Sequence, residues 1–287
     1  MSQKIKIYQI FYDEESKSKL DPAFLPLDNS LNIESDWFEF SAIRNYLLCN
    51  DLDQDTFYGF LSPNFYSKSQ FRSHYIIDLI STYGSRIDVA LFTIRWDHIA
   101  YFTNPFEQGE CIQPGTLKET QNFLDSIHID INLKKFITHS QTAAYSNYII
   151  AKPSYWLKWL LLANKFYDYT KINSAVNQPV IHRGEANVAL KVFIQERLSS
   201  IILSMNKFRV ATPDQGMNGL ITESYYSNNS HTRPLLIACN ILKERYCNTG
   251  DSEYLKMFYK LRKEVVLNTN TYYGSSVNKL INSETAS

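Results

Sequence analysis

The 287-residue chain has few glycines and no excess of charge of either sign. Its 9 glycines form neither G-x-G-x-x-G nor G-x-x-x-x-G-K-[ST], which excludes the usual glycine-rich phosphate loops. The motif G-x-S-x-G is also missing, which argues against an α/β-hydrolase. With 29 basic and 29 acidic residues the net charge is zero, whereas nucleic-acid-binding proteins usually carry a basic surface. The sequence therefore predicts no nucleic-acid partner.

The sequence also lacks the patterns that are typical of metal-binding, secreted and membrane-spanning proteins. None of the 4 cysteines forms a C-x-x-C pair, and the 6 histidines show no H-x-x-x-H spacing. The N-terminus has no apolar signal core, and no run approaches the roughly 18 apolar residues of a spanning helix. We expect a cytoplasmic protein, with the inner face of the cell membrane as an alternative place. Membrane contact would be peripheral at most, through segment 154–166, although burial of that segment is favoured.

Hydrophobic residues make up 44% of the chain, which is ample for a large core. Strands are predicted at 5–12, 57–61 and 87–94, within 142–153, and as a final strand at 207–214; helices are predicted at 37–50, 73–84, 114–127, 154–169, 187–205 and 231–265. Strands alternate with helices first, and helices dominate the last third, so an α/β fold is expected: a layered sheet with a helical C-terminal part. Segment 100–110 is expected to be irregular. One domain is predicted over 1–265, followed by a loose tail over 266–287.

The start of the first long helix has a recognisable local pattern. Asp36 precedes the helical segment 37–50, and Glu39 follows it by three residues, which is the spacing of a capping box. The tryptophans Trp156 and Trp159 lie three apart on a predicted helix, a spacing more typical of a core than of a sugar-binding platform.

Polar side chains follow each of the predicted strands. In open α/β sheets, ligands bind beyond the carboxyl ends of the strands. We therefore expect these residues to outline one rim: Gln9, Tyr12 and Asp13; Ser62, Pro63 and Asn64; Arg95, Trp96 and Asp97; Ser146, Asn147 and Lys152.

A series of short motifs adds a resemblance to a known family. In order, they are YQIFYDEE, WFEFSAIRNYLL, FYGFLSPNF, NPFEQGE, SNYIIAKPSYWLKWL and FIQERLSSIIL. This series resembles bacterial glycosyltransferase-like proteins from polysaccharide gene clusters, which are similar to the GT-A class. The resemblance implies a GT-A-like (Rossmann-like) domain that binds a nucleotide-sugar donor. It also implies sugar transfer to a cell-surface glycan or lipid-linked glycan acceptor, such as lipopolysaccharide, O-antigen or capsule.

Within this resemblance, the rim becomes a nucleotide-sugar site. Gln9, Tyr12, Arg44 and Ser62 are expected to bind the nucleoside diphosphate, because the fixed fork of an arginine suits that group. The same site would include Asn64, Asp97, Asn147 and Lys152.

The expected metal ligands of a GT-A enzyme are replaced in this chain. The strand in FYGFLSPNF would normally end in Asp-x-Asp, but Ser62 and Asn64 stand there. The aspartates in DLDQD, residues 51–55, precede the strand and are read as a solvated turn. Since a metal needs charged oxygen ligands to hold the diphosphate, no metal ligand is assigned and little dependence on Mn²⁺ or Mg²⁺ is predicted. A divalent metal stays open as a cofactor, with Asp97 as the first candidate ligand.

Without a metal, other positive groups would have to neutralise the leaving nucleotide. Arg44, Lys68, Lys152 or a helix N-terminus could do so.

Two stretches could supply the general base that deprotonates an acceptor hydroxyl. Glu196, in FIQERLSS, lies on a predicted helix, where packing can fix its side chain. Glu107, in NPFEQGE, is the alternative, on a segment expected to be mobile; Glu110 and Asp97 are further rivals. A surface glutamate without a catalytic role also explains Glu196. Because Asp-x-Asp is missing, a non-catalytic sugar- or protein-binding module on the same fold remains the alternative function.

Overall fold

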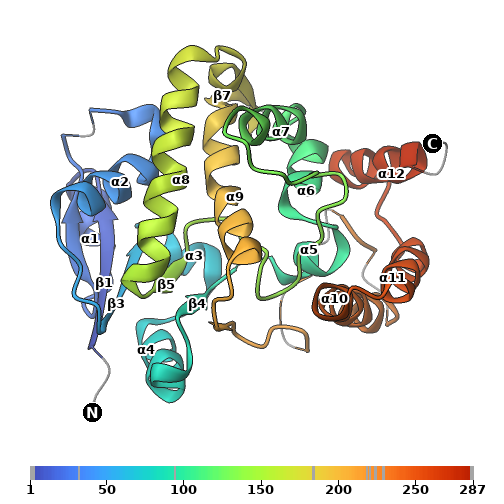
Figure 1. Ribbon diagram of the computed structural model, residues 1–287, viewed down its shortest axis with the longest axis horizontal. Helices are drawn as coiled ribbons and strands as arrows, with labels where there is room; N and C mark the ends of the chain where they lie inside the picture. Colours follow the sequence, from blue (N-terminus) through green and yellow to red (C-terminus); the bar gives the residue numbers. More distant parts are fainter. Residues whose placement is uncertain are drawn as a thin grey trace. The chain divides into compact units, whose positions relative to one another are not determined.

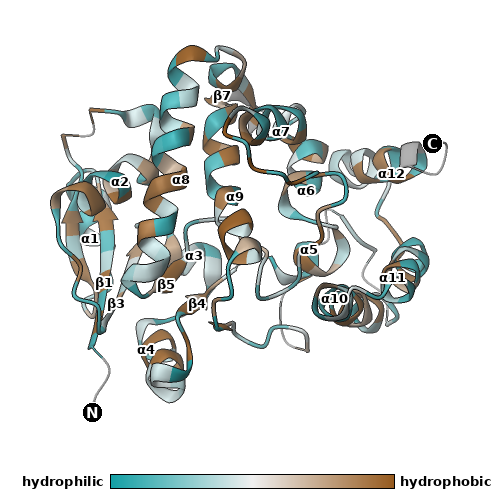
Figure 2. Cartoon of the chain, in the orientation of Figure 1, coloured by the Kyte–Doolittle hydropathy of each residue, from teal (hydrophilic) through white to brown (hydrophobic). Residues whose placement is uncertain are grey.

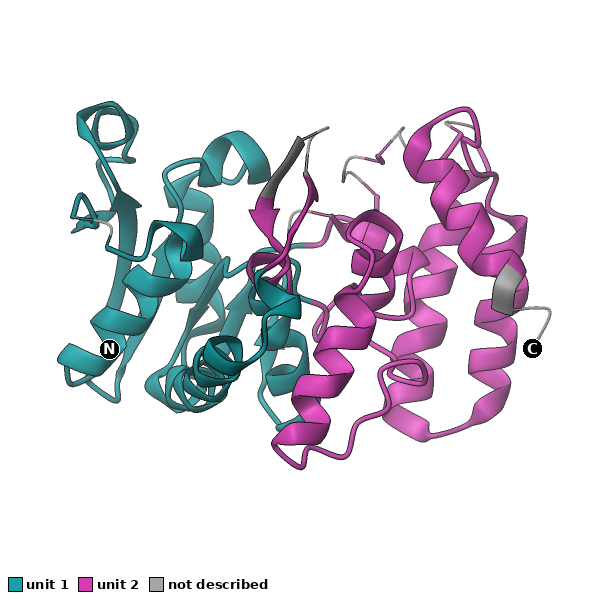
Figure 3. Ribbon diagram, turned by 90° about the horizontal axis from the view of Figure 1, so that it is seen from above, with its two compact units in different colours: residues 1–94, 144–177, 195–213 teal, residues 95–143, 178–194, 214–287 magenta. Residues whose placement is uncertain are grey.

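The computed structural model describes residues 4–31, 33–93, 95–182, 185–217, 219, 221–222, 225–227 and 230–284. Two compact units, coloured teal and magenta in Figure 3, make up the chain. Unit 1 comprises residues 1–94, 144–177 and 195–213, and unit 2 comprises residues 95–143, 178–194 and 214–287. The single domain expected over 1–265 stays a prediction beside this division.

Unit 1 contains a six-stranded sheet (Figure 1). Its strands are β1 Lys4–Phe11, β2 Leu25–Asp28, β3 Thr56–Leu61, β4 Val89–Leu91, β5 Ile149–Ala151 and β8 Val210–Ala211. Their order is β2-β1-β3-β5-β4-β8. The strand β5 runs antiparallel to both of its neighbours, while the other pairs are parallel. The carboxyl ends of β1 and β3 therefore lie at the same edge, and β5 begins there.

The helices of unit 1 cover a strongly apolar sheet. They are α1 Glu14–Ser18, α2 Glu39–Cys49, α3 Phe65–Ser69, α4 Ser73–Tyr83, α8 Pro153–Ile172 and the part of α9 (Leu190–Met205) from residue 195. Every residue of β3 is buried. On α8, Trp156 and Trp159 are each 1% exposed, and Trp156 Nε1 donates a hydrogen bond to Tyr58 O at 2.9 Å. The two tryptophans are thus core residues, as expected.

In Figure 1, α8 lies beside α2, and the two helices are in contact. Figure 2 shows hydrophobic and hydrophilic residues mixed along α8, as a helix with one buried face requires. The predicted capping box at Asp36 is wrong: that residue lies in the 3-10 turn Ser35–Trp37, and α2 begins at Glu39 after Phe38, without a side-chain cap. Two further 3-10 turns cover Gly84–Arg86 and Ala175–Asn177.

Unit 2 is mainly helical. It contains α5 Trp96–Tyr101, α6 Pro105–Ile112, α7 Thr116–Ser126, α10 Thr232–Thr249, α11 Ser252–Glu264 and α12 Tyr272–Glu284, with the antiparallel pair β6 Pro179–His182 and β7 Glu185–Ala189. The irregular segment expected at 100–110 is wrong, because Asn104 accepts hydrogen bonds from Phe106 N and Glu107 N and thereby caps α6. In place of a loose tail after residue 266, the chain forms α12 and buries Val277.

The expected fold class is confirmed as an α/β layered sheet with a helical C-terminal part. The β2 strand and the β6–β7 pair were not foreseen. Each is short, and sheet pairing rather than local sequence pattern determines such segments.

The glycine of FYGFLSPNF is required by close packing. Gly59 pairs with Ile150 of β5, and a Cβ at Gly59 would lie 2.6 Å from Ile150 Cγ1. We expect Gly59→Ala to lower the free energy of unfolding by about 1–3 kcal/mol, because both strands are buried there. Urea denaturation measures this loss. In an Ile150→Ala background the same substitution should cost less, and an equal cost in both backgrounds would contradict the steric explanation.

Candidate active site

Two predicted rim residues, Gln9 and Ser62, meet at the carboxyl ends of β1 and β3. Gln9 is 2% exposed, and its Nε2 donates hydrogen bonds to Ser62 O at 3.2 Å and Pro63 O at 3.4 Å. Its Oε1 accepts a hydrogen bond from Asp21 N at 2.7 Å. Gln9 therefore holds together the two loops that follow β1 and β3, and so shapes the rim.

Ser62 stands where the resemblance to GT-A enzymes would place a metal-binding aspartate, and its hydroxyl makes local hydrogen bonds instead. Its Oγ accepts a hydrogen bond from Asn64 N at 3.1 Å, which closes a short turn before α3. The same Oγ lies 3.3 Å from the hydroxyl of Tyr148. Asn64 itself is exposed and stands at the N-cap of α3 without a side-chain cap. The strand end thus carries a hydroxyl pair, Ser62 and Tyr148.

Glu39 joins these residues from the first turn of α2. Burial raises the pKa of the Tyr12 phenol, and the Glu39 carboxylate raises it further. Burial also raises the pKa of Tyr148; the hydrogen bond with Ser62 opposes this rise, and the charges of Glu39 and Glu196 add to it. Glu39 therefore lies within electrostatic reach of both tyrosines. The sequence pattern had assigned it only to a helix cap, so its place in the site was missed.

Glu196 completes the group from α9. It is partly buried between two buried neighbours, Gln195 and Arg197. Burial raises its pKa from 4.5 to about 7; Arg197 and Lys68 oppose that rise, and Glu39 adds to it. The neighbouring Gln195 Oε1 accepts a hydrogen bond from Asn147 Nδ2 at 3.0 Å, which brings a further predicted rim residue to α9.

We name these residues the edge cluster: Gln9, Tyr12, Glu39, Ser62, Tyr148 and Glu196. They come from five separate parts of the sequence and meet through the hydrogen bonds and electrostatic interactions described above. A carboxyl group with a pKa near neutrality can accept and donate a proton under physiological conditions. Chemically, the edge cluster can therefore perform general acid–base catalysis beside two buried phenols.

Lys152 does not lie on this rim, and its predicted placement there is wrong. Because β5 is antiparallel, the residue that follows it lies at the opposite edge of the sheet. There Lys152 N donates a hydrogen bond to Asp88 O at 2.9 Å, and its Nζ is 4.0 Å from Asp88 Oδ1.

Arg44 contacts α8 and is half-buried. Its Nε donates a hydrogen bond to Asn164 Oδ1 at 2.7 Å, and its guanidinium carbon lies 4.2 Å from the centre of the Tyr167 ring. These contacts give Arg44 a role in packing α2 against α8. Its binding to a diphosphate stays a prediction.

Asp97 belongs to unit 2 and is fully buried. Its Oδ2 accepts a hydrogen bond from Thr222 N at 2.7 Å and lies 4.0 Å from His98 Nε2. Within the part of the chain that the structure describes, no group hydrogen-bonds to its Oδ1.

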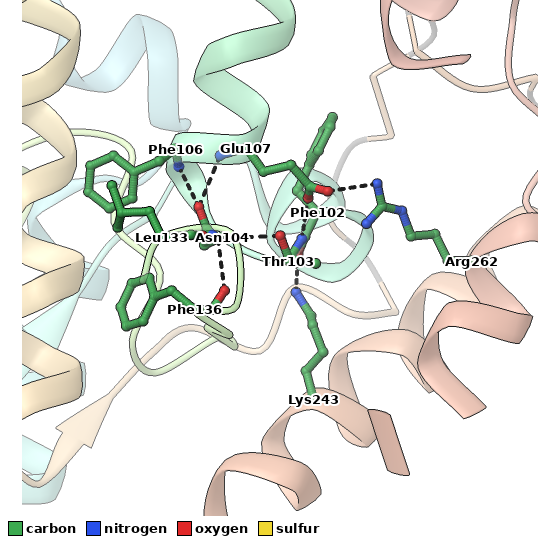
Figure 4. Close-up of polar contacts among 9 residues, drawn as sticks. All are labelled: Phe102, Thr103, Asn104, Phe106, Glu107, Leu133, Phe136, Lys243 and Arg262. Atoms are coloured by element: carbon green, nitrogen blue, oxygen red, sulfur yellow. Dashed lines mark hydrogen bonds and ion pairs between the residues drawn. The ribbon is translucent and has the colours of Figure 1, made fainter. Parts of the chain in front are cut away.

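Glu107 is also in unit 2, within a buried polar network drawn in Figure 4. Its Oε2 accepts a hydrogen bond from Thr103 N at 2.5 Å, and its Oε1 pairs with Arg262 Nη2 at 2.9 Å. Glu107 and Arg262 are 4% and 2% exposed. The expected mobility of this segment is wrong: Glu107 links α6 to α11. Its part as an alternative base stays a prediction.

Lys243 and Glu110, two further charged residues of unit 2, also make structural hydrogen bonds to the backbone. Lys243 Nζ donates hydrogen bonds to Ile99 O and Phe102 O, and burial lowers its pKa to about 7. Glu110, the other rival base, accepts hydrogen bonds from Gly115 N and Leu117 N at the start of α7.

Among the described residues, no group of three or more His, Cys, Asp and Glu side chains could hold a metal ion. Over the same residues, the helices are all too short or too polar to cross a membrane.

Neither a scan of protein-family models nor a search of curated proteins finds a match to the chain. Among solved structures, it is similar to the apo structure of the WbbM bifunctional glycosyltransferase, with 16% sequence identity and a TM-score of 0.46. The similarity covers 76% of this chain and 47% of the WbbM chain, so this chain spans about half the length of that protein. This likeness identifies neither a substrate nor a site residue.

Proposed function

We propose that the protein is a glycosyltransferase that moves a sugar from a nucleotide-sugar donor to a hydroxyl group of a glycan acceptor. The observation that carries the proposal is Glu196: a carboxyl group with a pKa of about 7 at the carboxyl edge of an α/β sheet. The class of donor rests on the motif series in the sequence. The same resemblance supports a cell-surface or lipid-linked glycan as the acceptor, and a reaction in the cytoplasm or at the inner face of the cell membrane.

In the proposed reaction, Glu196 takes the proton of the acceptor hydroxyl while the hydroxyl oxygen bonds to the anomeric carbon of the donor. The bond between that carbon and the diphosphate oxygen breaks, and the diphosphate leaves with its electron pair. A pKa of about 7 suits this step, because about half of the molecules carry the basic form at neutral pH. Lys68, whose charge acts on Glu196, would attract the anionic leaving group.

Direct binding and turnover measurements test the proposal. Titration calorimetry with a panel of nucleoside diphosphate sugars should give saturable binding for at least one donor. Incubation of that donor, radiolabelled in its sugar, with glycan acceptors should transfer the label. Binding without transfer or donor hydrolysis would instead favour a non-catalytic sugar-binding module. Failure of every donor to bind would contradict both.

We also propose that transfer proceeds without a divalent metal. The Ser62 hydroxyl already accepts a hydrogen bond in its own turn, and Asn64 offers only a neutral amide, so neither fits a diphosphate-bound metal ion. Removing metal with EDTA should change the rate by less than about twofold, as neither residue offers a metal-binding charge. Loss of transfer in EDTA and recovery with Mn²⁺ would contradict this prediction. Asp97, whose Oδ1 accepts no hydrogen bond from the described residues, would then be the first ligand to test.

A further inference from the structure

Unit 2 contains a pocket between α5, α11 and α12 with a volume of about 500 Å³. This volume lies within the roughly 300–1,000 Å³ range of small-molecule sites. We name it the α11–α12 pocket. Its polar lining residues are Tyr101, Arg262, Lys263, Thr269, Asn278 and Asn282, and apolar residues of the α11–α12 connection and of α12 complete the wall.

The lining of this pocket is positively charged. Arg262 and Lys263 contribute two cations, and none of the described lining residues is acidic. Arg262 is buried, whereas Lys263 and Asn278 are exposed. The pocket therefore combines a buried guanidinium in its wall with an exposed ammonium group and an exposed amide on the solvent side.

Two basic side chains lie near each other behind the pocket. Arg262 pairs with Glu107, and burial, with the charge of Arg262 acting in the same direction, lowers the pKa of Lys243 to about 7. The buried network drawn in Figure 4 thus holds two basic side chains and one carboxylate. An anion in the pocket would lie beside the Arg262 guanidinium, which lines it, and would be attracted by its positive charge.

We propose that the α11–α12 pocket binds an anionic small molecule whose carboxylate or phosphate group contacts Arg262 and Lys263. Arg262 lines the pocket, and the planar donor fork of a guanidinium matches either anion. The volume exceeds what a bare anion needs, and Asn278, Asn282 and Thr269 supply donors and acceptors for a polar organic body. This site is independent of the proposed transferase activity.

Titration calorimetry of the full chain tests the site with three probes of similar size: glucose 1-phosphate, glucuronate and glucose. We expect at least one anionic probe to bind and neutral glucose not to bind. Comparing the two anions shows whether phosphate or carboxylate is preferred. Equal binding of glucose, or no binding of either anion, would overturn the proposal.

Variants assign the binding to this pocket. Lys263→Ala removes one positive charge at the solvent side and Asn278→Asp adds one negative charge there, so each lowers the local charge by one unit and should weaken anion binding about fivefold to tenfold. Lys260→Ala is the matched control, since this exposed lysine of α11 makes the same charge change outside the lining. Equal affinity in the control and both pocket variants would place the anion elsewhere and refute the assignment. Arg262 is left intact because its pair with Glu107 supports the fold.

Discussion

Replacing Glu196 with glutamine should reduce turnover by about 100-fold or more while donor affinity is retained. Glutamine has nearly the same shape, so the packing of α9 should persist, but it cannot accept a proton from the acceptor hydroxyl. Steady-state kinetics with the donor identified by calorimetry measure kcat and KM, and calorimetry on the variant measures donor binding. If Glu196 served only in packing and not in catalysis, the substitution would leave kcat nearly unchanged.

The pH profile gives this prediction a second readout. Because burial raises the pKa of Glu196 to about 7, its basic form accumulates as the pH rises through 7. The wild-type rate should therefore rise over the same range, whereas the residual rate of Glu196→Gln should lack this limb. A wild-type rate that is flat from pH 6 to pH 8, with chemistry rate-limiting, would contradict Glu196 as the base.

The contribution of Glu196 to folding stability should fall as the pH rises, whereas the reaction rate should rise. The pKa of Glu196 is raised from 4.5 to about 7, so the folded state binds more protons than the unfolded state between these values. Its contribution to the free energy of unfolding is therefore full below about pH 4.5 and is lost as the pH rises through 7. We expect Glu196→Gln to be more stable than wild type at pH 8 by about 1–3 kcal/mol.

A matched control separates the role of Glu196 from a general effect of removing charge. Glu15 is an exposed residue of unit 1 that pairs with Lys19 at 2.5 Å. Glu15→Gln should leave turnover within about twofold of wild type, because exposed ion pairs contribute little. Near-normal turnover in Glu196→Gln, together with a loss of kcat in folded Glu107→Gln, would transfer the catalytic role to Glu107.

Glu107→Gln should lower the free energy of unfolding by about 3–5 kcal/mol. The substitution keeps an oxygen that can accept from Thr103 N but leaves the buried guanidinium of Arg262 without its counter-charge. Urea denaturation followed by circular dichroism measures the loss. A large change in midpoint with an unchanged slope would show that the folded and unfolded states are otherwise alike.

An exposed pair in the same unit provides the control. Glu253 pairs with Lys256 at 2.6 Å, and both side chains are well exposed. Glu253→Gln should cost about 0–1 kcal/mol, since water and side-chain entropy offset the attraction of an exposed pair. Equal costs at the two positions would contradict a buried, structural role for Glu107.

The sequence by itself determined the class of fold and part of the rim. Runs of β-branched and aromatic residues predicted β1 and β3, and the spacing of Trp156 and Trp159 predicted a core helix. The rule that ligands bind at the carboxyl ends of parallel strands correctly brought Gln9 and Ser62 together. These features are local, or follow from local features by one general rule, so the order of residues is enough to predict them.

Only the tertiary structure decided which side of the sheet each remaining residue reaches. Because β5 is antiparallel to its neighbours, Lys152 lies at the opposite edge of the sheet and Tyr148 lies next to Ser62. The first turn of α2 brought Glu39 within reach of Glu196, although 157 residues separate them in the chain. Strand direction and helix placement depend on pairing and packing between distant segments. The same carboxylate or lysine can therefore be a site residue or a structural one, and the fold alone decides between them.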